Sequence, residues 1–301
     1  MTEYSDMPVY FHRLAPGCPS EDVLYDFYQD GLIICHYENE ASFSDEDYDD
    51  STDIEEIVQL ANSGGICLIQ LDAGNDYYDR GRKLGVVIPE TEPFILGVRS
   101  DGTRTKRYAD REEAQNVLEN NDEVEYIYKV LQLQENIREL GPGEFLLSSY
   151  EPPHTTLTQW SVVEDQIRSI LSDTPLPTDE PTSYSPDQTE RLCEEYLREE
   201  YEYYPLIQPG GRGGVNQSFD LIGGINNDRA FGEVKNIKGT SDSALNDLEA
   251  EAGSGKRAFY FSRNPVDQDV DDVEVILLEE VINKLFEIDR TKQMMKEMTG
   301  R

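Results

Sequence analysis

Two acidic residues and one lysine interrupt apolar segments in the last third of the chain. Asp220 lies within FDLI, and twelve residues separate it from Glu233, which begins the sequence EVK in the next apolar segment. A carboxylate inside an apolar strand is costly unless it is paired or bound. Residues i and i+2 of a strand share a face, so Glu233 and Lys235 should point the same way, and Asp220 on the adjoining strand can lie beside them.

These residues fit a magnesium site. The expected ligands are the carboxylates of Asp220 and Glu233 and the backbone carbonyl of Val234, with water completing an octahedron. A metal there would lower the pKa of a bound water and neutralise charge on a scissile phosphate. Lys235 would position the nucleophile or stabilise the transition state. The expected chemistry is phosphodiester hydrolysis with Mg²⁺, or with Mn²⁺ in its place.

A second interpretation of the same residues is a cross-strand salt-bridge set, worth about 0–1 kcal/mol if exposed. An isolated E-x-K is uninformative, because an acidic chain produces several by chance. The spacing, the apolar flanks and the order of the surrounding elements together favour the catalytic interpretation. Arg212, in the loop GGRGG, either belongs to a flexible turn or binds a phosphate close to the metal.

The second half of the chain alternates helices and strands. A helix should begin after Ser185, with Pro186 in its first position and Gln188 closing a capping box, and should continue through ERLCEEYLREEYE. Strands are then expected in YYPLIQP, SFDLIGG and RAFGEVKNI, a helix in DSALNDLEAEA, strands in RAFYFS and DVEVILL, and a terminal helix in EEVINKLFEIDRTKQMMKEM. This order predicts an α/β or α+β sandwich with a central mixed sheet.

With FDLI, EVK and this order of elements, residues 186–264 resemble the PD-(D/E)XK nuclease superfamily, particularly its restriction-endonuclease-like and Mrr-like branch and the related archaeal junction resolvases. The resemblance implies an αβββαβ core. It also implies that Asp220 and Glu233 are metal ligands and that Lys235 is the catalytic lysine.

Members of this family often place another acid on the first helix. The match puts Glu190 in that position, and Glu194, one turn later, is the reserve candidate. The chain departs from the family pattern in two places: Phe219 replaces the usual proline before the aspartate, and the helix after the third strand lacks the glutamine common in Mrr-like enzymes. The subfamily therefore stays open.

The function implied is a Mg²⁺-dependent DNA endonuclease, serving host defence. Two alternatives stay open: a non-catalytic nucleic-acid-binding subunit with the same fold, and a junction-resolving or repair nuclease. The expected partner is DNA. Duplex cleavage often needs two active sites, which a homodimer would supply.

The first half of the chain has a different sequence pattern. Short apolar runs separated by turns predict the strands of a sheet or small barrel: MPVYFHRL, GLIICHY, ICLIQL, KLGVVIP, FILGV, YIYKVLQL and EFLLSSY. Helices are expected at Glu21–Tyr28, Asp53–Ala61, Arg111–Asn120 and Val162–Leu171. The predicted organisation is a mostly-β domain at 1–171, a solvated proline-rich linker at 172–187, and the nuclease-like domain at 188–301.

A cationic ribbon is expected in the first domain. Asp101-Gly102 between two strand-like runs signals a hairpin, and it carries four cations that suit phosphate contact: Arg99, Arg104, Lys106 and Arg107. Arg80, Arg82 and Lys83 would extend this patch. The competing interpretation is a salt-bridge face that meets the chain's own carboxylates. The barrel-like texture is faintly similar to PUA-like and EVE-like domains, which implies a reader of modified bases.

The overall charge is strongly negative. The 301 residues include 26 Lys and Arg against 62 Asp and Glu, for a net charge of −36. This composition resembles that of proteins from salt-in halophilic archaea, in whose molar salt the Debye length is about 3 Å and repulsion is screened. An acidic inhibitor that mimics nucleic acid is the competing explanation.

Several classes of protein are disfavoured. The four cysteines are isolated from one another, which argues against zinc and disulfide frameworks, and three histidines without a nucleophile elbow argue against a Ser-His-Asp hydrolase. The P-loop and dinucleotide fingerprints are missing from the sequence. Without a run of roughly 18 apolar residues or a signal peptide, we expect a soluble, cytoplasmic protein that does not insert into membranes.

Overall fold

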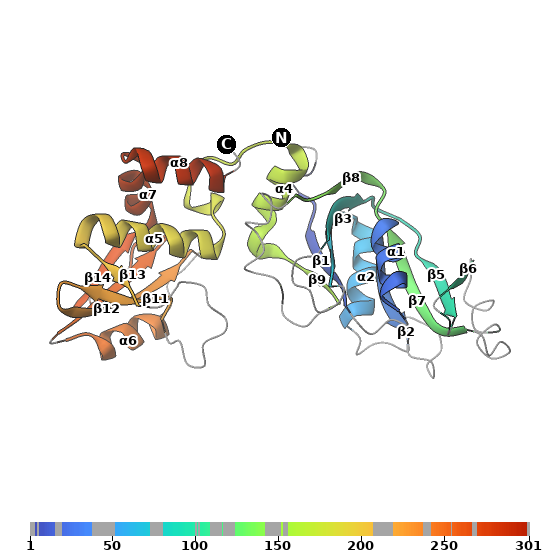
Figure 1. Ribbon diagram of the computed structural model, residues 1–301, viewed down its shortest axis with the longest axis horizontal. Coiled ribbons are helices and arrows are strands. Elements are labelled where there is room, and N and C mark those ends of the chain that lie inside the picture. The colour runs from blue at the N-terminus through green and yellow to red at the C-terminus, as the bar shows by residue number, and fades with distance from the viewer. Residues whose placement is uncertain are drawn as a thin grey trace. The chain divides into compact units, whose positions relative to one another are not determined.

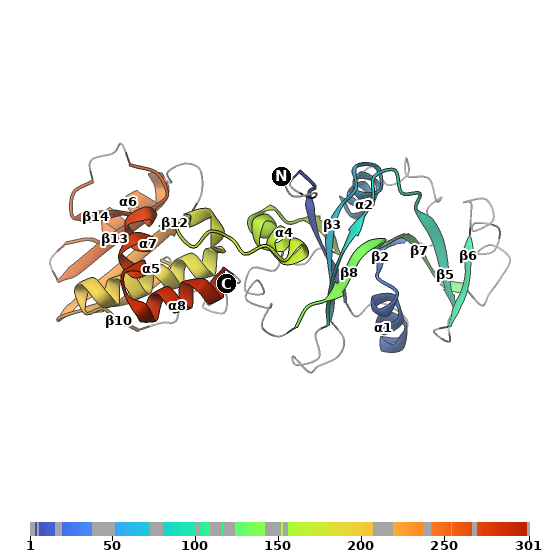
Figure 2. The same cartoon turned by 90° about the horizontal axis from the view of Figure 1, so that it is seen from above.

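The structure is a computed structural model of the chain, shown in two perpendicular views in Figures 1 and 2. It describes residues 4, 6–15, 20–37, 52–72, 81–99, 101, 103–108, 116, 124–141, 152, 156–206, 219–236, 242–253, 255–266 and 270–299. The chain divides into two compact units, and the division falls between Ser172 and Asp173. This is the point at which the sequence analysis places the start of the linker.

The N-terminal unit combines strands and helices. Its strands are β1 (Val9–Leu14), β2 (Leu32–Tyr37), β3 (Gly65–Leu71), β4 (Arg82–Val87), β5 (Phe94–Arg99), β6 (Arg104–Tyr108), β7 (Val124–Gln132), β8 (Glu135–Glu139) and β9 (Leu157–Gln159). Its helices are α1 (Glu21–Gln29), α2 (Thr52–Ser63) and α4 (Glu164–Ser172), with a 3-10 turn at Ser161–Val163.

The described strands of this unit form two sheets instead of one closed barrel. Their orders are β8-β4-β3-β1-β9 and β2-β7-β5-β6. The pairing of β1 with β3 is parallel, and the other pairs in these sheets are antiparallel. Each predicted strand and helix in the described ranges is confirmed. The helix expected at Arg111–Asn120 and the strand EFLLSSY fall outside the described ranges, apart from Asn116.

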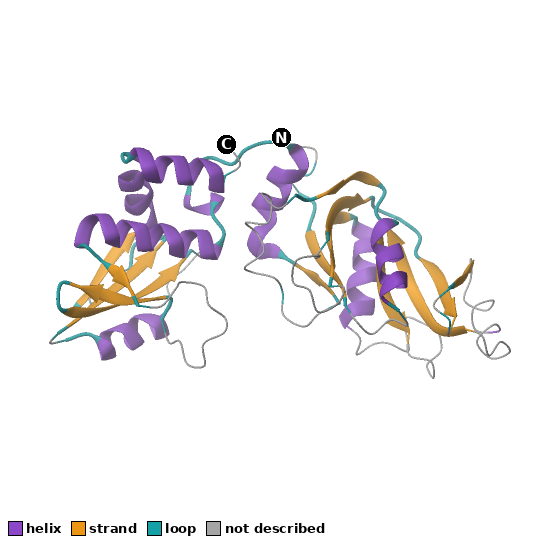
Figure 3. Cartoon of the chain, viewed as in Figure 1, coloured by secondary structure: helices purple, strands orange, loops and turns teal. Residues whose placement is uncertain are grey.

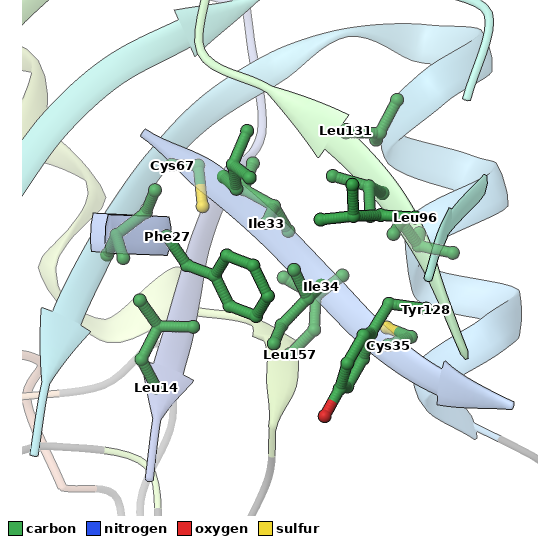
Figure 4. Close-up of a cluster of buried hydrophobic side chains, with 14 of the residues drawn as sticks. Leu14, Phe27, Ile33, Ile34, Cys35, Cys67, Leu96, Tyr128, Leu131 and Leu157 are labelled. Carbon is green, nitrogen blue, oxygen red and sulfur yellow. The ribbon is translucent and has the colours of Figure 1, made fainter. Parts of the chain in front are cut away.

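Buried apolar side chains from α1, α2 and both sheets make one core in the N-terminal unit. Figure 4 shows Phe27 of α1 in this cluster, and its ring meets Tyr128 edge-on at 5.7 Å between centroids. His12 is completely buried and joins three segments: Nδ1 donates to the Thr156 carbonyl at 2.8 Å, and Nε2 accepts from the Ile34 N–H at 3.1 Å. Burial lowers the pKa of His12 to about 4, so the ring is neutral.

Two strands of this unit were not predicted. In β8 the sequence ENIRE is too polar to show an apolar run, and its pairing with β4 contains a register shift. In β9 only three residues pair with β1. Both lie at the edges of their sheet, and most of their residues are exposed or half-buried, so burial does not select apolar side chains there.

The C-terminal unit is a sheet between helices, as Figures 1 and 3 show. Its helices are α5 (Pro186–Tyr201), α6 (Asp242–Glu251), α7 (Leu278–Phe286) and α8 (Asp289–Met298), and a 3-10 turn covers Pro181–Ser183. Its strands are β10 (Tyr204–Pro205), β11 (Leu221–Ile225), β12 (Asp228–Lys235), β13 (Lys256–Ser262) and β14 (Val273–Leu277). They lie in the order β10-β11-β12-β13-β14.

The sheet is mixed, as the sequence predicts. The pairs β10–β11 and β11–β12 are antiparallel, whereas β12–β13 and β13–β14 are parallel. Helix α6 connects the parallel pair β12 and β13. Alternation along β12 sends Val234 into the core shared with α5 and α7, and Phe231 into the smaller core under α6. Glu233 and Lys235, at odd positions like Phe231, therefore lie on the α6 side.

The start of α5 follows the sequence closely. Ser185 accepts from the backbone of Gln188 and the Gln188 side chain accepts from the Ser185 N–H, so the predicted capping box is confirmed. The expectation of a solvated linker before it is wrong. Thr178, Ser183 and Tyr184 are buried, and the Tyr184 hydroxyl donates to the Thr178 carbonyl at 2.6 Å. Prolines fix this segment in extended and 3-10 conformations that still pack on the unit.

The expected single terminal helix is instead two helices. The helix is interrupted between α7 and α8, where the Thr291 hydroxyl donates to the carbonyls of Leu285 and Ile288. These bonds compete with helical ones at the turn. The change of direction brings Met295 of α8 into the core, where it is completely buried.

Two adjacent glycines of β11 lie under tyrosine rings. A Cβ added at Gly223 would lie 2.2 Å from the ring of Tyr203, and one at Gly224 would lie 2.4 Å from that of Tyr204. Tyr203 is 5% exposed, whereas Tyr204 is 48% exposed and has room to rotate away. The two sites therefore differ in tolerance although their contacts are similar.

We predict that Gly223→Ala lowers the free energy of unfolding by about 1–3 kcal/mol, the usual cost of overpacking. Gly224→Ala should cost clearly less, because the Tyr204 ring can move into solvent. Denaturant unfolding of both variants in high salt checks this. Equal losses would contradict the packing described for Tyr203.

Candidate functional site

The carboxylate of Asp220 extends the pairing of β11 with β12. The last backbone pair at this end joins Leu221 to Gly232. One residue before β11, Asp220 uses Oδ2 to accept a hydrogen bond from the Val234 N–H at 2.8 Å. A side chain thus takes the place of the next backbone acceptor and brings the carboxylate to the end of β12.

Glu233 and Lys235 form an ion pair beside it. Their side chains are 13% and 24% exposed, and the Lys235 ammonium donates to Glu233 Oε1. Burial raises the pKa of the Glu233 carboxyl, and the negative charge of Asp220 adds to that effect. Burial alone would lower the pKa of Lys235, but its bond to Glu233 raises that pKa overall, so the lysine stays charged.

The backbone of β12 presents a carbonyl to the same region. The Lys235 carbonyl accepts from the Arg263 N–H at 3.2 Å and so faces β13. Successive residues of a strand direct their backbone groups to opposite neighbours. The N–H and carbonyl of Val234 therefore face the β11 side, where the N–H already meets Asp220. This is the carbonyl that the sequence analysis assigns to the metal.

Glu190 lies in the first turns of α5, near these groups. Burial first, and then the negative charges of Asp220, Asp187 and Glu233, raise the pKa of its carboxyl to about 8, while Lys235 opposes them. Within the described part of the chain, Glu190 Oε2 is buried without a hydrogen-bond partner. The structure therefore brings all four predicted catalytic side chains into one electrostatic neighbourhood.

The reserve candidate Glu194 is engaged elsewhere. Its carboxylate pairs with Arg191 at 3.2 Å and with Arg198. Glu195, which is completely buried, binds the same two arginines and also Arg290 of α8 at 2.8 Å. This network joins α5 to α8. Of the two glutamates that the sequence offers, Glu190 is the one whose carboxyl interacts with Asp220 and Glu233.

The site suits a cation that binds through few protein ligands. The carboxyl of Glu190 interacts with the charges of Asp220, Asp187 and Glu233 and with the ammonium of Lys235, so acidic groups outnumber the cation here. Among the described residues, no group of three or more His, Cys, Asp or Glu side chains is arranged to hold a metal by itself. Mg²⁺ commonly binds one or two carboxylates and keeps several waters. Asp220, Glu233 and the Val234 carbonyl fit that requirement, and the unpartnered Glu190 oxygen can accept from a bound water.

Sequence reasoning missed Asn236, the residue after Lys235. Its amide nitrogen lies 2.8 Å from the Pro181 carbonyl and 3.1 Å from Thr189 Oγ1. It thereby ties the end of β12 to the start of α5. The available signal was a polar residue directly after an apolar strand, but its partners lie 47 and 55 positions away in sequence.

The predicted hairpin in the N-terminal unit is confirmed as β5 and β6. Asp101 closes the turn by accepting from the Thr103 N–H at 2.9 Å and from its hydroxyl at 2.7 Å. Arg99 is exposed. The other cations predicted for nucleic-acid contact have side chains outside the described part of the chain: Arg104, Lys106, Arg107 and Arg212.

The expected extension of the patch is wrong for Arg82 and Lys83, which are buried. Arg82 Nε donates to Gln70 Oε1 at 2.9 Å. Lys83 Nζ donates to the carbonyls of Tyr28 and Gln29 at 2.8 Å each, closing the C-terminus of α1. Successive side chains of a strand point to opposite faces of the sheet, and β4 is buried on both faces, so both cations are buried. The sequence shows only that these residues are charged. Arg80 lies outside the described residues.

The surroundings of the hairpin are acidic. A cleft of about 650 Å³ between α1 and the hairpin turn is lined by four aspartates: Asp22, Asp26, Asp30 and Asp101. These side chains favour the interpretation in which the ribbon's cations meet the chain's own carboxylates.

Comparison of the chain with protein-family models, curated proteins and solved structures finds no match. No helix in the described ranges combines the length and apolar character needed to cross a membrane.

The raised pKa of Glu190 predicts how stability depends on pH. Its ordinary value is 4.5 and its value in the folded protein is about 8. Between these values the folded state holds a proton that the unfolded state has lost, so the free energy of unfolding should fall as pH rises through this window. Glu190→Gln should remove this fall and should be more stable than wild type above pH 8, by an amount on the order of a few kcal/mol.

Urea unfolding at constant high salt from pH 4.5 to 9 measures the effect. Glu249→Gln, at an exposed position of α6, is the matched control and should keep the wild-type profile. A Glu190→Gln profile that also follows wild type would show that Glu190 is solvated and does not face the site.

Proposed function

We propose that the C-terminal unit is a Mg²⁺-dependent endonuclease that hydrolyses phosphodiester bonds of DNA. The observation that carries the proposal is the convergence of Asp220, Glu233, Lys235 and Glu190 at one end of β12. A salt-bridge set alone would be expected to balance its charges and satisfy its oxygens. This cluster has an excess of carboxylates and one buried oxygen, Glu190 Oε2, without a partner in the described structure.

The arrangement of the C-terminal unit supports the same proposal. The helix, the three antiparallel strands, the crossover helix and the parallel strand follow one another as the αβββαβ core requires. Within this arrangement the carboxylates come from the start of β11 and the end of β12, on neighbouring strands. The mixed α+β architecture is observed, and its assignment to the restriction-endonuclease-like core is part of the proposal.

Each residue has a role that its surroundings allow. When bound, Mg²⁺ would lower the pKa of a coordinated water and neutralise charge on the phosphate. Asp220 and Glu233 would hold it, together with the carbonyl of Val234. The Lys235 ammonium, kept charged by Glu233, would hold the attacking water and stabilise negative charge on the phosphoryl oxygens in the transition state.

Glu190 is suited to handle a proton. Its pKa of about 8 lies close to neutral pH, where a general base or acid is most effective. Water attack on phosphorus forms one P–O bond and releases a proton, while the bond to the leaving oxygen breaks and that oxygen takes up a proton. A carboxylate at the position of Glu190 can accept the first of these protons through a bound water.

The proposal extends to the N-terminal unit as a recognition domain for DNA or a modified base, within a defence enzyme. The β5–β6 hairpin with Arg99 supports it, and the acidic cleft beside that hairpin weighs against a broad basic surface. In molar salt, counterion release contributes little to binding. Short-range contacts would then have to supply the affinity for DNA.

We predict that Lys235→Ala reduces Mg²⁺-dependent cleavage at least about 100-fold with folding intact, since it removes a charge aimed at the transition state. Lys256→Ala is the matched control, because Lys256 lies on the neighbouring strand β13 and pairs with Glu251 away from the site. Cleavage of linear, modified and branched duplexes in high salt, with circular dichroism of each variant, provides the measurement.

Two results would overturn the proposal. Cleavage that is unchanged in Lys235→Ala would remove this site from the reaction. Wild-type protein that binds DNA but never nicks it with Mg²⁺ or Mn²⁺ would favour a non-catalytic subunit. A preference for branched substrates would instead identify a junction-resolving nuclease.

A further inference from the structure

We propose that Asn236 is a positioning residue that fixes the catalytic end of β12 to α5 and to the segment connecting the two units. The proposal rests on the function proposed above for Asp220, Glu233 and Glu190. It concerns a side chain outside that set, which holds the parts of the site together.

The hydrogen bonds of Asn236 determine how its amide is oriented. The nitrogen lies 2.8 Å from the Pro181 carbonyl, 3.5 Å from the Tyr184 carbonyl and 3.1 Å from Thr189 Oγ1. Two of these partners are backbone carbonyls, which only accept hydrogen bonds, so the amide NH₂ group must face them. A donor is therefore required here, and an apolar side chain would lose all three of these contacts between β12 and the chain around the start of α5.

Two of the partners, Pro181 and Tyr184, belong to the segment that leads from the N-terminal unit into α5, and the third, Thr189, lies in α5 itself. This connector, residues 173–185, contains the 3-10 turn at Pro181–Ser183. It is anchored to α8 as well, since the Leu176 N–H donates to the Thr299 carbonyl at 3.1 Å. Asn236 is thus the joint between the connector and the strand that carries Glu233 and Lys235.

This joint determines where Glu190 lies. Thr189, which accepts from Asn236, is the residue immediately before Glu190, and its own hydroxyl donates to the Ser185 carbonyl at 2.9 Å. On the other side, Asn236 directly follows Lys235. The amide of Asn236 therefore sets the separation between the helix that carries Glu190 and the strand that carries the proposed ligands. Without its hydrogen bonds, the helix and the strand would be free to move apart.

The test compares Asn236→Ala and Asn236→Leu with Tyr184→Phe in the full-length chain at high salt. Leu is branched at Cγ like Asn but is somewhat larger and has no hydrogen-bond donors. Tyr184→Phe is the matched control because it removes a buried hydrogen bond of the same connector, from the Tyr184 hydroxyl to the Thr178 carbonyl, that does not reach β12. The two readouts are Mn²⁺ affinity by calorimetry and hydrogen–deuterium exchange of residues 181–193 and 228–236.

We expect both Asn236 variants to lose about 10–100-fold in Mn²⁺ affinity, as is usual when a residue that orients metal ligands is removed. Both should also exchange faster in the two segments, while Tyr184→Phe keeps the wild-type affinity. Asn236 variants that keep the wild-type affinity, or a Tyr184→Phe variant that loses as much, would overturn the positioning role.

The exchange measurement separates this proposal from the proposed function. If wild-type protein binds no Mn²⁺, the metal site is wrong, and exchange alone decides the role of Asn236. Faster exchange at both segments in the Asn236 variants would then support the joint, and unchanged exchange would overturn it.

Discussion

The hydrogen bond from the Val234 N–H to Asp220 Oδ2, at 2.8 Å, joins two strands where their backbone pairing has ended. It holds a carboxylate at the exit of β12, beside the Glu233–Lys235 pair, and leaves the Val234 carbonyl facing the same region. The rest of the C-terminal unit supports this junction. Two apolar cores fix the faces of the sheet, the capping box fixes the start of α5, and Asn236 connects that helix to the strand.

The electrostatics of the site differ from those of the chain as a whole. The net charge of −36 belongs to the whole chain, and salt would screen the long-range repulsion that it causes. In the site, buried carboxylates face a single ammonium, and burial raises the pKa of both Glu190 and Glu233. Salt screens the surface charges far more than these buried ones. The interactions among these buried groups therefore persist in molar salt, where a bound divalent cation would displace the proton that Glu190 holds at neutral pH.

The sequence predicted the parts of the fold that local patterns specify. Apolar flanks located the strands around Asp220 and Glu233, and Ser185 with Gln188 located the start of α5. It could not show which charged residues are buried. Lys83, for example, has the sequence pattern of a surface cation, and its burial depends on the contact with α1. It could not show Asn236 either, since the partners of that side chain are distant in sequence. The break between α7 and α8 depends on Thr291, whose role appears only in the folded chain.

The central claim is that Asp220, Glu233 and Glu190 form one cation site at the end of β12. Calorimetry of Mn²⁺ binding at pH 7 in molar salt, repeated in buffers of different ionisation enthalpy, tests it most directly. The wild-type chain should bind the cation and release a proton, because a bound cation lowers the raised pKa of Glu190, and Asp220→Asn should bind far more weakly. Absence of binding in wild type, or equal affinity in Asp220→Asn, would contradict the account.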